Sequence, residues 1–335
     1  MSQPHPYSTL PIPKTAPFKL QPSPGKGWGA FATRRIHQGT IILTETPLFS
    51  IPKHHDQITE TDIYLAFQSL SPSQKQHFLA LRNNASTTFP TMTAAFAENC
   101  FGRSTEPGPH ALGLYILHSR FNHSCLPNAK IPRTDLTVGI TSVAMRVIGA
   151  GEEITFCYET DFECRTRRER QDILHFVCGC RACVPGTEFQ AASEMRRTLV
   201  RGLQYLTLGR DLDGQRHGGH GHDSARRPLI FDPVLKKAAE DLEIPTSSRL
   251  VYLLLTMVLL EEEGLLDGYM VERFAPSLRF VSRSFSLKSS ASIAGFAMVQ
   301  KRWIERFCVA MHLWGRADPG DAAVQAVLKA VRGLE

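Results

Sequence analysis

The sequence has no hydrophobic run long enough to cross a bilayer. Its longest apolar stretch, Val251 to Leu260, is about half of the ~20 residues that a transmembrane helix requires. Residues 1–17 also lack an apolar signal core and an arginine-rich amphipathic pattern, so we expect no secretion signal and no organelle address. We therefore expect a buried helix around the apolar stretch, no membrane association, and a location in the nucleus or the cytoplasm.

An excess of charge is also missing. Lys+Arg 38 against Asp+Glu 32 give a formal net charge of +6, which is too small to indicate a nucleic-acid-binding protein. Arginines are dense between Arg165 and Arg227 and could contact chromatin, but interspersed acidic residues such as Glu169 and Glu194 favour a solvated face. Direct nucleic-acid binding is therefore not expected, whereas the modest positive charge suits an acidic protein surface or a lysine-bearing tail near DNA.

The 8 cysteines stand in a chain with no secretion signal, which favours free thiols and metal ligation over disulfides. Cys178, Cys180 and Cys183 are close enough in sequence to bind one tetrahedral ion, for which Zn²⁺ is the usual occupant, and such a site needs a fourth ligand. The alternative is that the three are incidental cysteines in a turn. The remaining cysteines without ligand spacing, to which we assign no role, are Cys100, Cys157, Cys164 and Cys308.

Hydrophobic periodicity predicts a β-rich beginning and a helical end. Ser71 is the expected N-cap of a helix whose first turn contains Pro72. The expected strands are 18–20, 29–33, 40–45, 136–143 and 154–157, the first two flanking a glycine turn at 25–29. The expected helices are 59–70, 71–82, 165–174, 191–208, 233–242, 248–262 and 289–314.

These patterns divide the chain into four parts. Residues 1–13 are expected to be a flexible proline-rich leader, 14–160 a β-rich domain with a helical insert at about 50–110, 161–186 the cysteine segment, and 187–335 an all-α C-terminal region. Between the first two C-terminal helices, the glycine-rich segment Gly214–Arg227 contains His217, His220 and His222. These histidines could ligate a metal, but a solvent-exposed loop explains them better because glycines do not fix a geometry.

Three segments in fixed order resemble a SET domain with a post-SET segment. They are Asn122-His123-Ser124-Cys125 followed by Pro127-Asn128, then Gly151-Glu152-Glu153-Ile154-Thr155-Phe156-Cys157-Tyr158, then the cysteine triplet. The resemblance implies an α+β fold with short curled sheets, a knot-like crossing and a helical insert. It also implies transfer of a methyl group from S-adenosylmethionine to a lysine of a protein substrate, possibly a histone.

The resemblance assigns roles to individual residues. Tyr158 corresponds to the catalytic tyrosine, although a strand-ending tyrosine is more often a packing residue. His123 could likewise be a core histidine satisfied by backbone, and Phe176 could be a core residue rather than the aromatic that stacks on adenine. Cys125 becomes the fourth zinc ligand beside the triplet. The cofactor contacts implied by the resemblance are Lys26, Gly27, Trp28, Gly29, Asn99, Ser119, Asn122, His123, Tyr158 and Phe176.

The similarity extends from about Lys14 to Pro185 and is strongest to SMYD-like and fungal SET proteins. Between Ser50 and Asn99 the chain has no cysteine and only three histidines, His54, His55 and His77, so the MYND zinc finger of the SMYD branch is expected to be absent. Leu174 stands where SMYD-type sequences often have a tyrosine beside the cofactor. A different class of function, a catalytically silent SET scaffold that binds a protein partner or chromatin, stays open because a fold does not guarantee activity.

Overall fold

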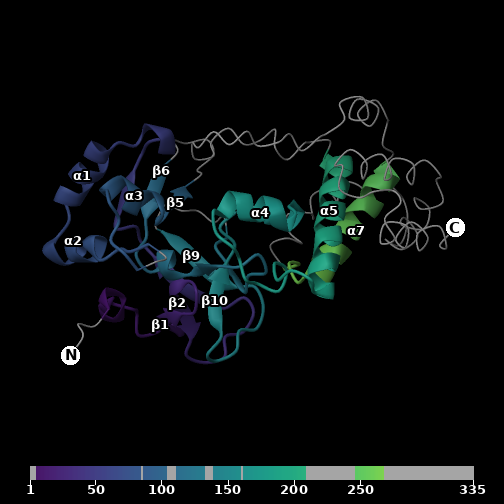
Figure 1. The fold of residues 1–335 in the computed structure, drawn as a ribbon, viewed down its shortest axis with the longest axis horizontal. Helices are drawn as coiled ribbons and strands as arrows, with labels where there is room; N and C mark the ends of the chain where they lie inside the picture. The colour runs from purple at the N-terminus through teal and green to yellow at the C-terminus, as the bar shows by residue number, and fades with distance from the viewer. Residues whose placement is uncertain are drawn as a thin grey trace. The chain divides into compact units, whose positions relative to one another are not determined.

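The computed structural model describes residues 5–83, 86–103, 111–132, 139–159, 161–208 and 246–267 (Figure 1). The chain forms two compact units, Met1–Tyr158 and Glu159–Glu335. The expected helices at 233–242 and 289–314, the histidine segment Gly214–Arg227 and Cys308 lie outside the described residues.

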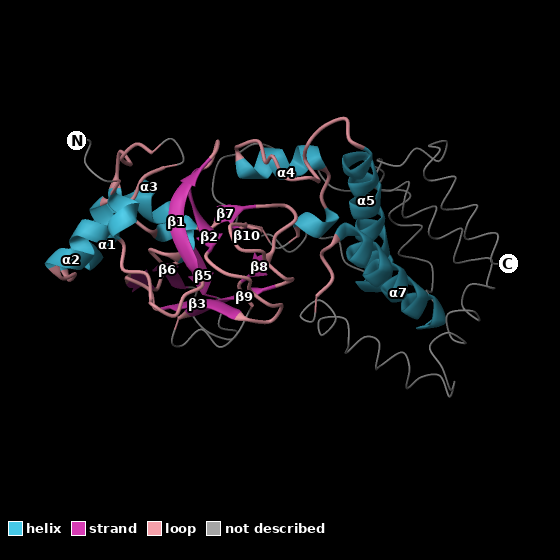
Figure 2. Ribbon diagram, turned by 90° about the horizontal axis from the view of Figure 1, so that it is seen from below, coloured by secondary structure: helices cyan, strands magenta, loops and turns pink. Residues whose placement is uncertain are grey.

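The first unit contains three small sheets (Figure 2). Their strand orders are β1-β2-β10-β7, β3-β9-β8 and β4-β6-β5. The strands are β1 (Phe18–Ser23), β2 (Gly27–Ala32), β3 (Ile41–Glu45), β4 (Phe49–Ile51), β5 (Cys100–Arg103), β6 (Ala111–Leu114), β7 (Asn122–His123), β8 (Ala129–Lys130), β9 (Ile140–Ala144) and β10 (Glu153–Phe156). This architecture of short sheets is the expected one.

The hairpin between β1 and β2 turns at the predicted glycine segment. Ser23 pairs with Gly27, and the Lys26 backbone N–H donates to the Ser23 carbonyl at 3.1 Å. Gly25 and Gly27 have φ of 71° and 73°, a region that glycine enters without steric cost. The turn therefore fixes where Lys26 and the backbone of residues 27–29 lie.

Strand β10 joins segments that are far apart in the sequence. It pairs antiparallel with β2 through Glu153↔Phe31 and Ile154↔Ala30. It also pairs in parallel with β7 through Thr155↔Asn122 and Phe156↔His123. A parallel pair cannot be closed by a tight hairpin, so the chain must travel away and return between these strands; the knot-like crossing itself stays a prediction.

The expected helical insert contains three short helices, α1 (Glu60–Gln68), α2 (Pro72–Leu79) and α3 (Met92–Ala97). Ser71 caps α2 as predicted, with Gln74 completing a capping box and Pro72 in the first turn. Thr59 and Asp62 form the same reciprocal box at the start of α1. Each box satisfies backbone donors that a helix N-terminus otherwise leaves without partners.

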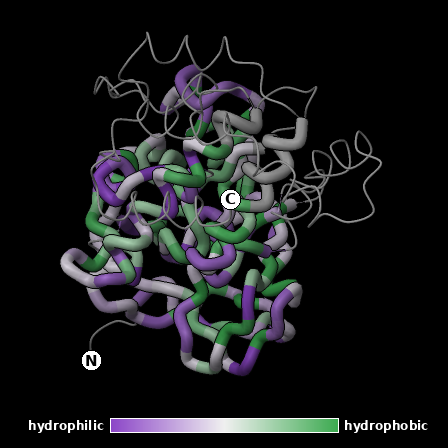
Figure 3. The backbone as a smooth tube through the Cα atoms, turned by 90° about the vertical axis from the view of Figure 1, so that its right-hand side faces the viewer, coloured by the Kyte–Doolittle hydropathy of each residue, from purple (hydrophilic) through white to green (hydrophobic). Residues whose placement is uncertain are grey.

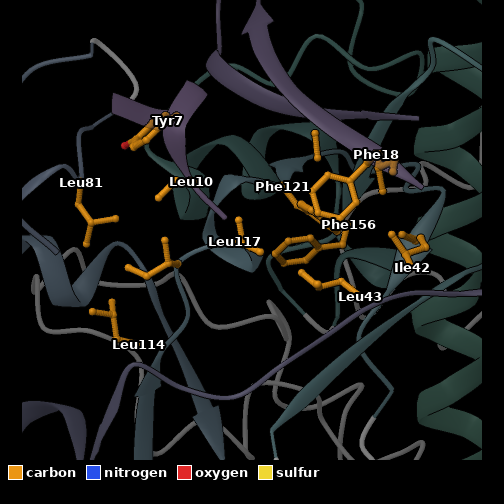
Figure 4. Packing of buried hydrophobic residues seen from close by; sticks show 14 of the residues in the cluster. Tyr7, Leu10, Phe18, Ile42, Leu43, Leu81, Leu114, Leu117, Phe121 and Phe156 are labelled. Carbon is orange, nitrogen blue, oxygen red and sulfur yellow. The ribbon is translucent and has the colours of Figure 1, made fainter. Parts of the chain in front are cut away.

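Residues 5–13 of the leader, the part that the structure describes, are packed, in contrast to the expectation of flexibility. Pro6–Thr9 forms the 3₁₀ turn η1, and Tyr7 and Leu10 are 4% and 7% exposed within the main hydrophobic cluster (Figure 4). The Tyr7 hydroxyl donates to the Arg82 carbonyl at 3.1 Å and accepts from the Arg82 N–H at 2.6 Å. Two buried side chains and two hydrogen bonds outweigh the disorder that a proline-rich composition favours.

The second unit is helical where it is described. It contains the 3₁₀ turn η4 (Phe162–Cys164), α4 (Arg167–Leu174), α5 (Glu188–Leu208) and α7 (Thr246–Glu263). Glu263 accepts from Arg196 Nε at 2.7 Å and Arg197 Nε at 2.8 Å, and Ser193 also donates to it. This buried network joins α5 to α7, which lie side by side in Figure 1.

Hydrophobic and hydrophilic residues are interspersed along the described backbone (Figure 3). Among the described residues, no helix has both the length and the apolar character of a membrane span.

Candidate functional site

The carboxylate of Glu153, at the start of β10, connects the glycine turn to the Asn-His segment. Its Oε1 accepts from Ser23 Oγ at 2.8 Å and from Asn122 Nδ2 at 2.8 Å. Its Oε2 pairs with Lys26 Nζ at 2.9 Å, and the Glu153 side chain is only 17% exposed. Two parts of the expected cofactor site, the glycine turn and the Asn-His segment, are therefore held by one partly buried carboxylate.

Gly29 is the position where the backbone approaches this network most closely. A Cβ added there would lie 2.5 Å from Glu153 Oε1 and 2.8 Å from Asn122 Nδ2. Both distances are shorter than van der Waals contact, so the absence of a side chain at residue 29 allows the network to form. The packing around Glu153 and Asn122 thus requires glycine at position 29, whether or not a ligand binds.

The orientation of the Asn122 amide is fixed by its partners. Nδ2 donates to the Trp28 carbonyl at 3.1 Å and to Glu153 Oε1 at 2.8 Å. Because both partners are acceptors, the NH₂ group must face them. Both amide protons are then used inside the protein, and only the amide oxygen is left to face a ligand.

His123 joins Tyr158 to the Cys125 loop. Its Nδ1 accepts from the Tyr158 backbone N–H at 3.1 Å, and its Nε2 lies 3.2 Å from Cys125 Sγ. Since Nδ1 is an acceptor, the ring proton belongs on Nε2, which donates to the sulfur. His123 is 3% exposed, so it is a buried histidine with both ring nitrogens in use.

Tyr158 presents one part of its ring to solvent and directs its hydroxyl inward. The residue is 44% exposed, yet its Oη donates to the Phe121 carbonyl at 3.1 Å. The ring centroids of His123 and Phe156 each lie 5.1 Å from that of Tyr158. Burial of the phenol raises the pKa of Tyr158 to about 12, against the opposing effect of Arg120. The phenol is therefore protonated at neutral pH.

Asn99 and Ser119 both contact Arg120. An Arg120 guanidinium nitrogen, Nη2, donates to the Asn99 amide oxygen and to Ser119 Oγ at 3.1 Å. Asn99 is 3% exposed and also donates to the Ala95 carbonyl at 2.7 Å. These two expected cofactor contacts thus share one cationic partner.

The four expected zinc ligands lie together. The sulfur atoms of Cys125, Cys178, Cys180 and Cys183 are all within 4.8 Å of one another, with Cys180 half-buried and the others buried. A tetrahedral zinc–thiolate centre with bonds of ~2.3 Å has sulfurs roughly 3.8 Å apart. The donor set and its spacing therefore fit a zinc ion.

Two cationic or N–H donors accompany the sulfurs. Arg170 Nη2 lies 3.3 Å from Cys183 Sγ and 3.1 Å from the Ala182 carbonyl, and His123 Nε2 faces Cys125. Such donors stabilise thiolates and orient the ligands of a metal site.

Phe176, the expected adenine-stacking residue, lies in the second unit, shortly after the end of α4, and is 37% exposed.

Sequence reasoning missed Glu153, Arg120 and Tyr7 as parts of this site. Glu153 stands inside the segment that carried the resemblance, so an acidic residue next to the strand could have been suspected. Arg120 directly precedes Phe121-Asn122 and had a similar positional signal. No local signal identifies Tyr7, whose partners at residues 28, 82 and 120 are distant in sequence.

Residues 27–159 match the family model described as the SET domain, and this part of the chain is a SET domain. The chain is 32% identical over 190 residues to the protein named histone-lysine N-methyltransferase set5 of Schizosaccharomyces pombe, covering 55% of this chain and 56% of that protein. It is 38% identical over 82 residues to protein-lysine N-trimethyltransferase SMYD5 of Danio rerio, covering 22% and 19%. The predicted similarity to fungal SET and SMYD-like proteins is confirmed, while the absence of a MYND finger stays a prediction.

The chain spans only about half, or less, of the length of these curated relatives. Among solved structures, the Neurospora SET domain protein DIM-5, titled a histone lysine methyltransferase, is similar at 16% identity with a TM-score of 0.27. That match covers 44% of this chain and 53% of the DIM-5 chain.

Proposed function

We propose that the protein is an S-adenosylmethionine-dependent protein-lysine N-methyltransferase that acts on a histone or another protein in the nucleus or the cytoplasm. The names of the relatives support the reaction class. The observation that carries the proposal is the parallel pair of β7 and β10, because it sets Asn122 and His123 beside Tyr158.

The site has hydrogen-bonding groups that the protein itself does not use, and these groups fit the cofactor. S-adenosylmethionine supplies an activated methyl group on a sulfonium sulfur. The chain offers the Asn122 amide oxygen, whose NH₂ group is bonded to Trp28 and Glu153, and the backbone of the glycine turn from Lys26 to Gly29. The proposed binding set also includes Trp28, Asn99, Ser119, His123 and Phe176. Asn99 contributes by holding Arg120, and His123 by holding the Tyr158 backbone.

Tyr158 is the proposed catalytic residue, through orientation of the amine and the methyl donor. Methyl transfer requires a neutral amine in line with the methyl group, whereas a free lysine has a pKa of about 10.4. An aromatic surrounding disfavours the charged amine. The ring centroid of Phe156 lies 5.1 Å from that of Tyr158 and 5.8 Å from that of Phe101, so the Tyr158 phenol lies beside aromatic rings.

Cys125, Cys178, Cys180 and Cys183 are the proposed ligands of one structural Zn²⁺ ion. Four thiolates leave no open position for a substrate, which is typical of structural rather than catalytic zinc. Metal analysis of the purified protein should give about one zinc per chain. Cys178→Ser should lose the metal, whereas Cys100→Ser should keep it, because burial raises the pKa of the Cys100 thiol to about 12 and keeps it protonated.

The decisive experiment is transfer of labelled methyl from S-adenosylmethionine to histones and to a cell lysate. Wild type should label a protein band, and Tyr158→Phe should reduce labelling on the order of 10²-fold, as loss of one oriented polar group in an active site does. Tyr64→Phe is the matched control, because Tyr64 is 50% exposed on α1.

Equal labelling by wild type and Tyr158→Phe would remove Tyr158 from catalysis. No labelling by the zinc-loaded wild type on any substrate, together with no binding of the cofactor, would favour the silent scaffold instead.

A further inference from the structure

Three segments of the first unit meet at a surface that contains none of the proposed site residues. The backbones of Ile36 and Ile148 exchange hydrogen bonds of 2.9 Å in both directions. The Arg34 guanidinium donates to the Thr15 carbonyl at 3.2 Å. The segments 13–16, 33–39 and 145–149 therefore lie side by side, although the last of them is distant from the others in the sequence.

Positive charge gathers where these segments meet. They contain Lys14, Arg34, Arg35 and Arg146 but no aspartate or glutamate, and all of these cationic side chains are exposed. Arg146 pairs with Glu152 at 2.6 Å, whereas Lys14, Arg34 and Arg35 form no ion pair with any residue that the structure describes. Charge that the protein does not neutralise attracts an anionic partner.

The same surface exposes aliphatic side chains. Ile36 and Ile148 are 2% and 0% exposed, so one face of this two-chain ribbon is turned to the core. Their neighbours along an extended chain point the other way, and Val147 and Ile41 are 41% and 61% exposed. Ile41 belongs to the same ribbon through its pairing with Val143. A single exposed aliphatic side chain needs no explanation, but two of them beside unpaired cations make the surface amphipathic.

We propose that this amphipathic surface binds an acidic segment of a partner protein in which aliphatic side chains accompany the carboxylates. The surface consists of Lys14, Arg34, Arg35, Ile41, Arg146 and Val147. A guanidinium matches a carboxylate with two parallel hydrogen bonds, which gives direction to the contact. The proposal goes beyond the proposed function and does not depend on it.

The exposed aliphatic side chains favour a protein over a nucleic acid as the partner. Duplex DNA would also be attracted by the cations, but binding that depends on phosphates alone leaves Ile41 and Val147 exposed. An acidic and aliphatic segment of a protein can instead contact both parts of the surface.

The test measures binding of a fluorescently labelled peptide, Leu-Ser-Leu-Ser-Asp-Ser-Asp-Ser-Asp, to the full chain by fluorescence anisotropy. Alternate residues of an extended peptide face the same side, so its leucines and aspartates can meet the surface together. The affinity should fall as the salt concentration rises. Replacing the aspartates by asparagine, or the leucines by serine, should each weaken binding by about 10-fold or more.

Two variants locate the binding on the protein, each with a matched control. Arg35→Glu should weaken binding of the peptide by about 10-fold or more, because it sets like charges against each other; Arg168→Glu makes the same change at an exposed arginine of α4 and should have no effect. Ile41→Ser should weaken binding about 3- to 10-fold. Its control is Leu65→Ser on α1, because Leu65 is 63% exposed, close to the 61% of Ile41.

The outcomes that would overturn the proposal are distinct. Equal affinity of wild type for the peptides with aspartate and with asparagine would show that the cations do not select carboxylates. Equal affinity of wild type and Arg35→Glu for the acidic peptide would place the binding elsewhere. Duplex DNA that binds more tightly than the peptide, and loses its affinity in Arg35→Glu, would assign the surface to a nucleic acid. Each of these results leaves the methyltransferase proposal standing, because methyl transfer is measured separately.

Discussion

Replacing Gly29 by alanine tests whether the Glu153 network is as tight as its distances indicate. The new Cβ would lie 2.5 Å from Glu153 Oε1 and 2.8 Å from Asn122 Nδ2. Both atoms end flexible side chains and could move in principle. However, Glu153 is held by Ser23 and Lys26 as well as by Asn122, so any movement breaks bonds to a charged group.

The magnitude follows from the two ways in which the protein can respond. If the carboxylate moves away, the two hydrogen bonds to Oε1 are lost, each worth about 1.5–3 kcal/mol because the acceptor is charged. If the side chains stay, the overpacked site costs about 1–3 kcal/mol. The less costly response determines the result, so we expect Gly29→Ala to lower the free energy of unfolding by about 1–3 kcal/mol.

Urea unfolding followed by circular dichroism measures this change, with Gly102→Ala as the control. A Cβ at Gly102 meets only Leu112 Cδ2 at 3.7 Å, which is ordinary contact, so the control should be neutral or slightly stabilising. Adding Glu153→Asp to Gly29→Ala shortens the carboxylate side chain, and the double variant should lose less stability than the two single losses added together. A Gly29→Ala variant within about 0.5 kcal/mol of the control would refute the reasoning.

Three further predictions concern other parts of the chain. Tyr7→Phe removes a hydroxyl that both donates to and accepts from the Arg82 backbone; it should cost about 1–3 kcal/mol in urea unfolding, while a loss no larger than that of exposed Tyr64→Phe would mean that the leader does not hold the core. Glu263→Gln leaves two arginines of α5 without their carboxylate and should cost about 3–5 kcal/mol in thermal or chemical unfolding; a change below about 1 kcal/mol would contradict the buried network. Burial raises the pKa of Tyr158 from 10.0 to about 12, so the unfolded chain releases this proton at a lower pH than the folded chain does. The contribution of Tyr158 to stability is therefore present below about pH 10 and is lost as the pH rises to 12. A difference titration of the phenol absorbance between wild type and Tyr158→Phe should show a midpoint near 12, and a midpoint near 10 would contradict this prediction.

The sequence predicted those parts of the fold that depend on local order. The glycine turn, the Ser71 cap and the strand before Tyr158 appear where periodicity and capping chemistry indicated. Each of these depends on residues that are neighbours in the chain. The order of the three motif segments was also enough to indicate the SET domain, because the order is specific even where each single motif is ambiguous.

The parts that could not be predicted depend on which distant groups meet. Glu153 gained its importance from partners in the glycine turn and in β7, which only the sheet brings together. The leader was expected to be flexible because composition reports the average character of a segment, whereas its packing depends on two side chains, Tyr7 and Leu10. Arg120 meets Asn99, which is distant in sequence, only in the folded chain, so the linear sequence does not reveal this contact.

The hydrogen bonds of Asn122 and His123 also change how the Asn-His pair should be understood. The resemblance implied that the Asn122 amide holds the cofactor directly, yet both of its protons are donated to Trp28 and Glu153. Both ring nitrogens of His123 are likewise used, by the Tyr158 backbone and by Cys125. The pair is therefore first a frame that connects the glycine turn, Tyr158 and the Cys125 loop. Since a methyl transfer depends mainly on alignment, we infer that the pair serves the proposed reaction by holding these parts in place.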